Sequence, residues 1–279
     1  MRSLAVSRNK WLILKHIVLI SGVAIMILPF LWMLSTSFKL PTEVLSWPPK
    51  FLPKVITFQN YSQVFITAPF HRFFINSILM STASTCSIII TSTLAGYIFA
   101  KFSFPGKNFL FILILATAMV PFETFMIPLY LRLVQFQWVN TFMGLITPYL
   151  VMSYGIFFMR QNVFSTIPDD LLDMARIDGV NEFGIYVRIV FPLLSGSIGA
   201  LSIFAFIASW GAFIWPLIIT ASRDLWTMEL GLGMFQFRFS VDLGAINAGS
   251  VMSIIPMIIV FLILRRKIVY GITLSGMKE

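Results

Sequence analysis

Six long stretches of this sequence contain no aspartate, lysine or arginine, and only one of them contains a glutamate. A helix needs about 20 consecutive apolar residues to cross the hydrocarbon core of a bilayer, and each stretch is longer than that. We therefore predict an all-α integral membrane protein with six transmembrane helices. The stretches are 16–38, 73–100, 108–131, 133–159, 189–222 and 243–264.

The composition supports a membrane protein and excludes several other classes. Hydrophobic residues make up 58% of the chain and charged residues 11%, against roughly 25% charged in ordinary soluble domains. One cysteine, Cys86, cannot form an internal disulfide. The net charge of +9 comes from cations beside the apolar stretches rather than from a basic stripe mixed with aromatic residues, so we expect a lipid bilayer as partner and no nucleic acid.

The distribution of lysine and arginine predicts the orientation, because cations in short loops collect on the cytoplasmic side. One side of the six predicted helices holds 13 of them and the other holds 7, so both termini are expected in the cytoplasm. The first stretch follows basic residues as a signal peptide would, but it is too long for a signal-peptide core and is expected to be retained. The larger group is Arg2, Arg8, Lys10, Lys15, Lys101, Lys107, Arg160, Arg176, Arg188, Arg265, Arg266, Lys267 and Lys278, and the smaller is Lys39, Lys50, Lys54, Arg72, Arg132, Arg223 and Arg238.

These patterns divide the chain into segments. We expect a cytoplasmic N-terminus at 1–15, a first helix at 16–38, an outer loop at 39–72, a five-helix core at 73–264 that includes an inner loop at 160–188, and a cytoplasmic tail at 265–279. A second outer loop is expected at 221–242, where Gly231 and Gly233 predict flexibility.

The inner loop contains a predicted short helix, 168–179, that holds four acidic residues. Ser165 or Thr166 is expected to cap it, Pro168 suits its first turn, and Gly179 suits a left-handed position after its end. Its apolar residues are too few for a core in the cytosol, which indicates docking into a groove on another protein. The alternative is a helix lying on the membrane, but such helices usually carry lysine and arginine rather than acids. The apolar residues are Leu171, Leu172, Ala175 and Ile177.

This loop resembles the E-A-A…G…I-L-P loop of permease subunits of binding-protein-dependent ABC importers. Asp173-Met174-Ala175, Gly179, Ile189 and Phe191-Pro192 stand at the spacing of that motif, with Asp173 in place of Glu, Met174 in place of Ala and Phe191 in place of Leu. The segment 175–179 is similar to the A-R-I-D-G form of the carbohydrate-uptake group.

The resemblance extends over nearly the whole chain and is to the second permease of maltose-type importers. It rests on Pro29-Phe30-Leu31-Trp32-Met33, Ser37-Phe38-Lys39, Asn76-Ser77, Leu94-Ala95-Gly96-Tyr97, Phe104-Pro105-Gly106-Lys107, Pro128-Leu129-Tyr130 and Tyr270-Gly271-Ile272-Thr273. It implies the type I ABC importer permease fold with a cytoplasmic coupling helix, in a bacterial cytoplasmic (inner) membrane. The implied partners are a second homologous permease, two ATPase subunits and an external solute-binding protein.

The resemblance also implies which residues couple the chain to the ATPases and to the binding protein. The predicted helix would seat in an ATPase cleft, with Asp173 facing a basic residue there. Gly231 and Gly233 would lie in the loop that faces the binding protein. The tail 270–279 would either reach the ATPases or end as a frayed polar segment. The coupling residues are Leu171, Leu172, Asp173, Ala175, Asp178 and Gly179.

The chain is expected to be a transport subunit and not an enzyme. It contains no G-x-x-x-x-G-K-[ST] sequence to cradle phosphates, so we expect no cofactor on this chain and the use of ATP and Mg²⁺ by the partner subunits. With only His16 and His71 and no Cys/His cluster, we predict neither a metal site nor nucleophilic catalysis.

Glu123 is the first candidate for the solute path, because it is the one acidic residue within a predicted span. It either lines the path or lies near the outer interface. Asn76, Ser209 and Trp210 are weaker candidates, since tryptophan more often packs or forms interfacial belts. The run of serine and threonine from Ser81 to Thr93 is expected to bring helices close together rather than to line a pore.

We expect this chain to form half of a translocation path for a carbohydrate, an oligosaccharide first of all, by alternating access driven by partner ATPases. Glycerol-3-phosphate or another polyol derivative is the alternative within the family, although the six stretches contain no lysine or arginine to attract an anion. A secondary carrier is the alternative from another class, but it ordinarily needs intramembrane ion ligands and repeated broken helices.

Overall fold

The structure is a computed structural model that describes the backbone of residues 2–236 and 242–275. Within these ranges the regular elements are helices, and no strand occurs. The chain divides into two compact units. Unit 1 comprises Met1–Ala68 and Leu232–Ile254, and unit 2 comprises Pro69–Gly231 and Ile255–Glu279.

Unit 1 begins with α1 (Arg2–Ser37), followed by the short helices α2 (Pro41–Val44) and α3 (Gln59–Thr67). The stretch Leu14–Ser37 of α1 is long and apolar enough to span a membrane, in agreement with the predicted first helix. The buried Asn60 of α3 donates hydrogen bonds to the backbone oxygens of Ser37 and Lys39, at 2.9 and 2.8 Å. One amide side chain therefore fixes α3 to the end of α1 and the residues just after it.

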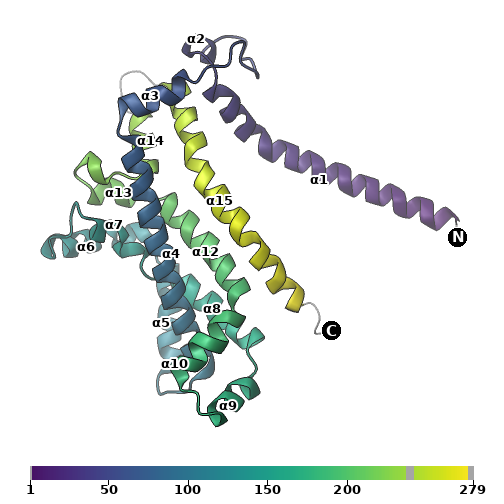
Figure 1. Cartoon of the computed structure of the whole chain (residues 1–279), viewed down its shortest axis with the longest axis vertical. Coiled ribbons are helices and arrows are strands. Elements are labelled where there is room, and N and C mark those ends of the chain that lie inside the picture. The colour runs from purple at the N-terminus through teal and green to yellow at the C-terminus, as the bar shows by residue number, and fades with distance from the viewer. Residues whose placement is uncertain (1, 237–241, 276–279) are drawn as a thin grey trace. The chain divides into compact units, whose positions relative to one another are not determined.

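The centre of unit 2 is α4 (Phe70–Lys101), which packs along α8 (Ser153–Thr166) and α12 (Ser195–Trp210), as Figure 1 shows. The helices α4 and α8 approach closely because small residues face each other. A Cβ atom on Gly96 would lie 2.8 Å from the backbone nitrogen of Arg160, and one on Gly155 would lie 2.5 Å from Ser92 Oγ. Ser81, Ser84 and Ser92 of α4 are fully buried, which confirms that this run packs helices together.

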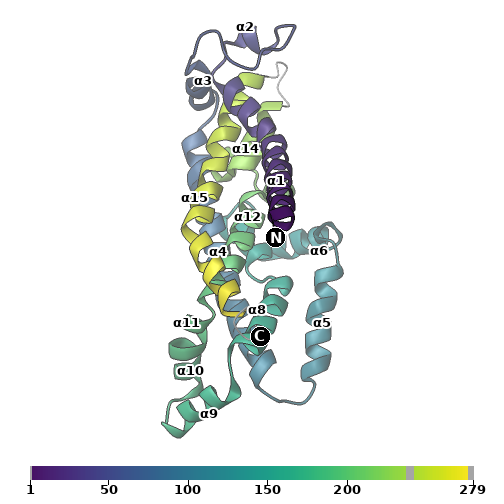
Figure 2. The same cartoon turned by 90° about the vertical axis from the view of Figure 1, so that its right-hand side faces the viewer.

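Three other apolar segments of unit 2 are broken helices. The pair α5 (Lys107–Met119) and α6 (Phe122–Gln135) meets at a 100° bend, which Figure 2 shows clearly. The second pair, 142–149 and α8, bends by 46°, and the third, 182–193 and α12, bends by 78°. Pro121, Pro148 and Pro192 lie at or near these breaks, where proline removes a backbone donor and disrupts the helix.

The remaining elements complete both units. Before the second break lie α7 (Phe142–Ile146) and the 3₁₀ turn η1 (Thr147–Tyr149), and before the third lie α10 (Glu182–Ile185), the π-helical η2 (Tyr186–Val190) and α11 (Phe191–Leu193). The segment after α8 forms α9 (Asp169–Ile177), and the last part of the chain forms α13 (Ile214–Ile219), η3 (Arg223–Leu225), α14 (Met228–Gln236) and α15 (Leu243–Ser275).

The number of spans agrees with the six predicted helices when each bent pair counts as one span. Three single helices are long and apolar enough to cross a membrane: Leu14–Ser37, Phe70–Lys101 and Leu243–Arg265. The three bent pairs supply the others. The all-α membrane fold is therefore confirmed, and three of its six spans are bent helix pairs.

Candidate functional site

The predicted helix of the inner loop is present as α9, nine residues long. Its N-cap is Pro168, which provides no side-chain cap, so the expectation of a cap from Ser165 or Thr166 is wrong. Thr166 is still part of α8, and Ser165 Oγ donates to the backbone oxygen of Asn162. The carboxylates of the first turn are therefore left to complement the positive end of the helix dipole.

The end of α9 confirms the expectation for Gly179, whose φ is +77°. The Gly179 amide donates to the oxygen of Arg176, and the Val180 amide donates to the oxygen of Ala175, both at 3.0 Å. This pair of bonds is the Schellman ending, which needs a left-handed residue that glycine adopts at low cost. The chain consequently turns back at once toward α10.

One side of α9 lies in the chain's own core, which differs from the expectation that its apolar residues need another protein. Leu172 is 1% exposed and Ala175 is 7% exposed. They pack in a cluster with Tyr97 of α4 and Met159 of α8. The core forms because the chain folds back after α9, so residues distant in sequence supply the missing apolar surface. These two coupling candidates hold α9 in place.

The opposite side of α9 leaves apolar side chains uncovered. Met174 is 57% exposed and Ile177 is 85% exposed, and Phe183 of α10 is 73% exposed. Asp173 and Asp178 are exposed as well. We call Met174, Ile177 and Phe183 the α9 apolar patch. Phe183 was not predicted as a site residue, although an aromatic side chain in a polar, acidic loop is a signal for it.

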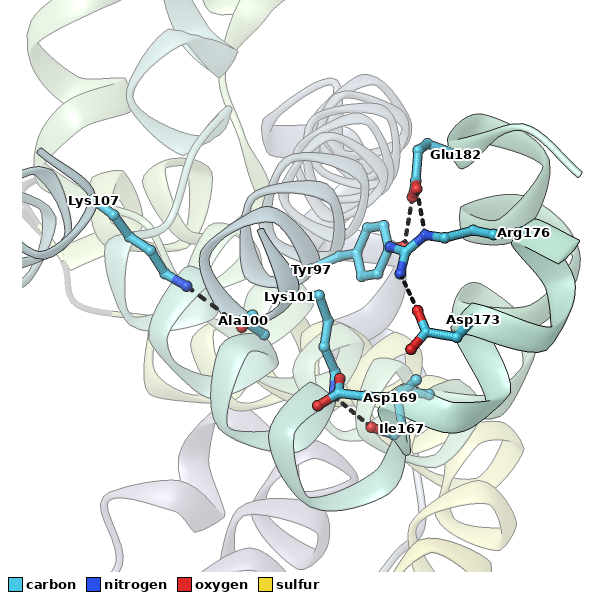
Figure 3. A network of polar contacts seen from close by, with 9 residues as sticks. All are labelled: Tyr97, Ala100, Lys101, Lys107, Ile167, Asp169, Asp173, Arg176 and Glu182. Carbon is cyan, nitrogen blue, oxygen red and sulfur yellow. Dashed lines mark hydrogen bonds and ion pairs between the residues drawn. The ribbon is translucent and has the colours of Figure 1, made fainter. Parts of the chain in front are cut away.

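Arg176 links α9 to α10 and, through Glu182, to α4, as Figure 3 shows. Its Nη1 lies 2.7 Å from Asp173 Oδ1 and its Nε lies 2.8 Å from Glu182 Oε1. Tyr97 of α4 donates to Glu182 Oε2 at 3.1 Å. Asp173, the residue expected to face a basic partner, therefore already has a cation of its own chain beside it.

These contacts shift the acid–base equilibria of the charged groups. The hydrogen bond with Glu182, and next that with Asp173, raises the pKa of the Arg176 guanidinium above its ordinary value. The hydrogen bond from Arg176 holds the pKa of the Glu182 carboxyl below its ordinary value, against the opposing effect of partial burial. Both pairs are well exposed, so each contributes only about 0–1 kcal/mol of stability.

Lys101, the last residue of α4, holds the start of α9. Its Nζ lies 2.6 Å from the backbone oxygen of Ile167 and 2.6 Å from Asp169 Oδ1 (Figure 3). The Lys101 side chain is 6% exposed while that of Asp169 is 77% exposed. The neighbouring Lys107 donates to the backbone oxygens of Phe102 and Ala100 and thus closes the turn after α4.

The other end of α4 holds the segment 223–231. Asn76 Nδ2 donates to the backbone oxygens of Asp224 and Trp226, at 2.7 and 3.0 Å. Ser77 Oγ accepts a hydrogen bond from the Met228 amide at 2.7 Å. The Asn76 amide, a weaker candidate for the solute path, is therefore engaged with its own backbone.

The expectation of a flexible outer loop around Gly231 and Gly233 is wrong for the described residues, because both glycines lie in α14. Gly231 is buried, and a Cβ atom there would lie 2.3 Å from Phe73 Cδ2. This glycine permits a close approach of α14 to α4 rather than a loose turn. The side chains of Met234 and Phe235 lie outside the described residues, as do those of the predicted tail contact 270–279.

The other solute-path candidates have different surroundings. Ser209 is buried, and its Oγ donates to the backbone oxygens of Ala205 and Phe206 within its own helix. Trp210 is 1% exposed and stacks on Phe206 with ring centroids 5.6 Å apart, which agrees with packing as its role. Glu123 is exposed in the first turn of α6, directly after the 100° break.

Ring contacts show which elements surround the solute-path candidates. The ring of Trp210 contacts the ring of Phe74, which lies two residues before Asn76 in α4. Trp210 and Asn76 therefore lie on parts of α12 and α4 that are next to each other. Glu123 belongs to α6, whose Phe122 contacts Trp215. Among the described residues, no group of three or more His, Cys, Asp and Glu side chains is placed to hold a metal ion.

The long apolar helices and bent helix pairs, with the polar helix α9 between two of them, are those of a polytopic membrane protein. Residues 92–270 match the family described as the binding-protein-dependent transport system inner membrane component. The chain belongs to this family, and it is therefore a multi-pass inner-membrane permease subunit of an ABC importer. It is not an enzyme, because ATP hydrolysis in such importers takes place on separate subunits.

Known proteins support this assignment over nearly the full length. The chain is 34% identical over 271 residues to the arabinooligosaccharides transport system permease protein AraQ of Halalkalibacterium halodurans, covering 96% of both chains. It is 29% identical to the sn-glycerol-3-phosphate transport system permease protein UgpE of Escherichia coli, covering 96% of this chain and 98% of that one.

A solved structure has the same fold. The crystal structure of a bacterial ABC transporter involved in the import of the acidic polysaccharide alginate contains a chain that superimposes with a TM-score of 0.80. That chain is 20% identical in sequence, and the match covers 93% of this chain and 97% of the other.

Proposed function

We propose that this chain forms half of the translocation path of an ATP-driven oligosaccharide importer and that the α9 apolar patch is where an ATPase subunit docks. The observation that carries the docking proposal is the two-sided character of α9. Leu172 and Ala175 fix the helix to its own bundle, while Met174, Ile177 and Phe183 remain uncovered. Burying such side chains in a partner groove is favourable in proportion to the apolar area removed from water.

The charge around the patch supports a basic groove as the partner surface. Asp170, Asp173 and Asp178 are exposed along the same helix. A membrane surface is a poorer partner, because the cytoplasmic leaflet is itself anionic. Asp173 would approach the groove together with Arg176, so a basic residue of the ATPase would join or replace an existing ion pair rather than meet a bare carboxylate.

The complete importer would contain a second homologous permease, two ATPase subunits that bind ATP and Mg²⁺, and an external solute-binding protein. The excess of cations on one side supports a cytoplasmic location for both termini and for α9. The segment 221–242 would then face the binding protein. Motion of the ATPases would reach the spans through α9 and alternate access to the path.

An oligosaccharide is the proposed solute because of the similarity to the arabinooligosaccharide permease and the A-R-I-D-G sequence at 175–179. Glycerol-3-phosphate is the alternative, supported by the relative from Escherichia coli. Glu123 is the proposed contact of this chain with the solute, since a carboxylate can accept hydrogen bonds from sugar hydroxyls and would repel a phosphate. This charge argument favours the neutral solute.

Docking and transport are tested together in proteoliposomes that contain the full importer. Ile177→Asp should place a charge in the patch, release the ATPases on purification and abolish uptake of labelled oligosaccharide. Leu45→Asp is the matched control, since Leu45 is 77% exposed in the outer loop, and it should retain the ATPases. Full ATPase attachment and normal uptake with Ile177→Asp would refute docking at α9, and uptake of glycerol-3-phosphate alone would refute the proposed solute.

A further inference from the structure

Both ends of α4 are fastened to segments that the proposed function places on opposite sides of the membrane. At the Phe70 end, Asn76 and Ser77 bind the backbone of 224–228. At the Lys101 end, Lys101 binds the start of α9 and Tyr97 binds Glu182 just after it. Figure 1 shows α9 and α10 near the Lys101 end of this helix. The two sets of contacts are carried by one continuous helix.

The helix between these contacts is long and unbroken. It has 32 residues and contains no proline. At 1.5 Å per residue it is about 48 Å long, which exceeds the hydrocarbon core of about 30 Å. The other spans that lie wholly in unit 2 are each bent by at least 46° in their described residues. A sharp bend can absorb a displacement at one end, whereas an unbroken helix in a packed core transmits it.

The burial of the contacts identifies which of them can transmit force. Ser77 is 1% exposed. The Lys101 side chain is 6% exposed and bonds the backbone oxygen of Ile167, a residue that is 1% exposed, whereas its other partner, Asp169, is 77% exposed. Hydrogen bonds in such surroundings are stronger than those in water. The pair of Arg72 with Asp224 also joins α4 to this segment, but its side chains are 55% and 69% exposed, so it contributes little. Gly231 also packs tightly against the ring of Phe73, which adds a close contact between α14 and α4.

We propose that α4 is a strut that couples the segment 223–231 to α9, with Ser77, Tyr97 and Lys101 as positioning residues. This inference rests on the proposed function. A binding protein that displaces the outer segment would pull on Ser77 and shift α4 along its packed face. Tyr97 and Lys101 would then move both ends of α9 and, with it, the docked ATPase.

The test measures how strongly loaded binding protein stimulates ATP hydrolysis by the complete importer in nanodiscs, relative to each variant's own unstimulated rate. Ser77→Ala and Tyr97→Phe each remove one hydroxyl. Each should lower the stimulation about fivefold, the shift expected on loss of one intramolecular hydrogen bond. Ser81→Ala is the control for Ser77, since Ser81 is equally buried on α4. Lys101→Met removes the bonds from α4 to the start of α9 and should lower the stimulation as well. Its control is Lys107→Met, since the described hydrogen bonds of Lys107 go to the backbone oxygens of Ala100 and Phe102 and not to α9.

The double variant distinguishes a single coupling path through α4 from two independent effects on the stimulation of ATP hydrolysis. If α4 carries the signal, Ser77→Ala with Tyr97→Phe should lose no more stimulation than the larger single loss, whereas independent paths multiply their losses. The conservative variants Ser77→Thr and Lys101→Arg keep the hydroxyl and the cation, so each should keep the stimulation that Ser77→Ala and Lys101→Met lose. A loss of stability caused by any change at these positions would not give this difference. If Lys101→Met does not assemble, Tyr97→Phe alone tests the contacts between the Lys101 end of α4 and the segment around α9.

The outcomes for the strut and for the proposed function are distinct. Single variants that match their controls, or a double variant whose losses multiply, would overturn the strut while the wild-type importer still transports and binds its ATPases through α9. A wild-type complex without binding-protein-dependent uptake would overturn the proposed function itself.

Discussion

Gly179 is the residue whose backbone conformation most directly determines the shape of the proposed docking site. It ends α9 with a φ of +77°, and no atom lies within 4 Å of the position that a Cβ would take. A substitution therefore acts within this chain through backbone strain and not through a clash. The strain would weaken the Schellman bonds that turn the chain toward α10.

We expect Gly179→Ala to destabilise the end of α9 by about 1–2 kcal/mol, the cost of a left-handed L-residue. Gly179→Asn should cost less, because asparagine tolerates that conformation. Hydrogen exchange of the amides in 175–185, measured on the purified importer, reports both. Equal protection in the alanine variant and the wild type would contradict the assignment of strain. Loss of ATPases from the asparagine variant with normal exchange would instead indicate crowding by the partner.

Arg176 shows why a motif residue cannot be interpreted separately from its neighbours. The spacing of Asp173 and Arg176 by three residues places their side chains together on one helix face. Glu182 then adds a second acceptor after the turn. The charge that α9 presents to a partner is therefore that of a network, in which one cation is shared by two carboxylates.

At the scale of elements, the close packing of α4 against α8 depends on small residues. Gly96 faces the backbone of Arg160, and Gly155 faces Ser92. Lipid tails are as apolar as the side chains, so helices in a bilayer associate through close packing. Arg160 adds to this pairing, because its Nε donates to the backbone oxygen of Phe99 near the end of α4.

Gly96→Ala should separate α4 from α8 and lower stability by about 1–3 kcal/mol, as overpacking of a tight contact does. Gly22→Ala is the matched control, since Gly22 lies inside α1 with no atom within 4 Å of a Cβ position. The control should be neutral or slightly stabilising, because alanine favours helices more than glycine does. The midpoint of thermal inactivation in detergent measures both variants, and equal midpoints would disprove the close approach.

At the scale of the whole molecule, the unequal distribution of cations predicts how the chain crosses the membrane. We expect single cysteines at Ser3 and Lys278 to be protected from a membrane-impermeant thiol reagent in intact cells. A cysteine at Glu43 should react. Cys86→Ala provides the background, since Cys86 is the one native thiol. Labelling of both termini from outside would reverse the topology, and labelling at Glu43 after lysis only would do the same.

The sequence predicted the class of fold and the location of α9, and both follow from local rules. Runs without charge predict spans, and Asp169, Asp170 and Gly179 mark a helix and its end. The resemblance to importer permeases supplied the family. The caps at Ser165 and Thr166 were wrong because α8 continues through Thr166, and a helix that continues leaves no capping position there.

Long charge-free runs by themselves determined that this chain is helical and crosses a membrane, because lipid imposes length and polarity on each segment separately. Only the tertiary structure decided which side of α9 is free, that Gly231 meets Phe73, and that α4 alone among the spans lying wholly in unit 2 is one unbroken helix through its described residues. These properties depend on contacts between residues far apart in sequence. The period of a single helix carries no information about what packs against it.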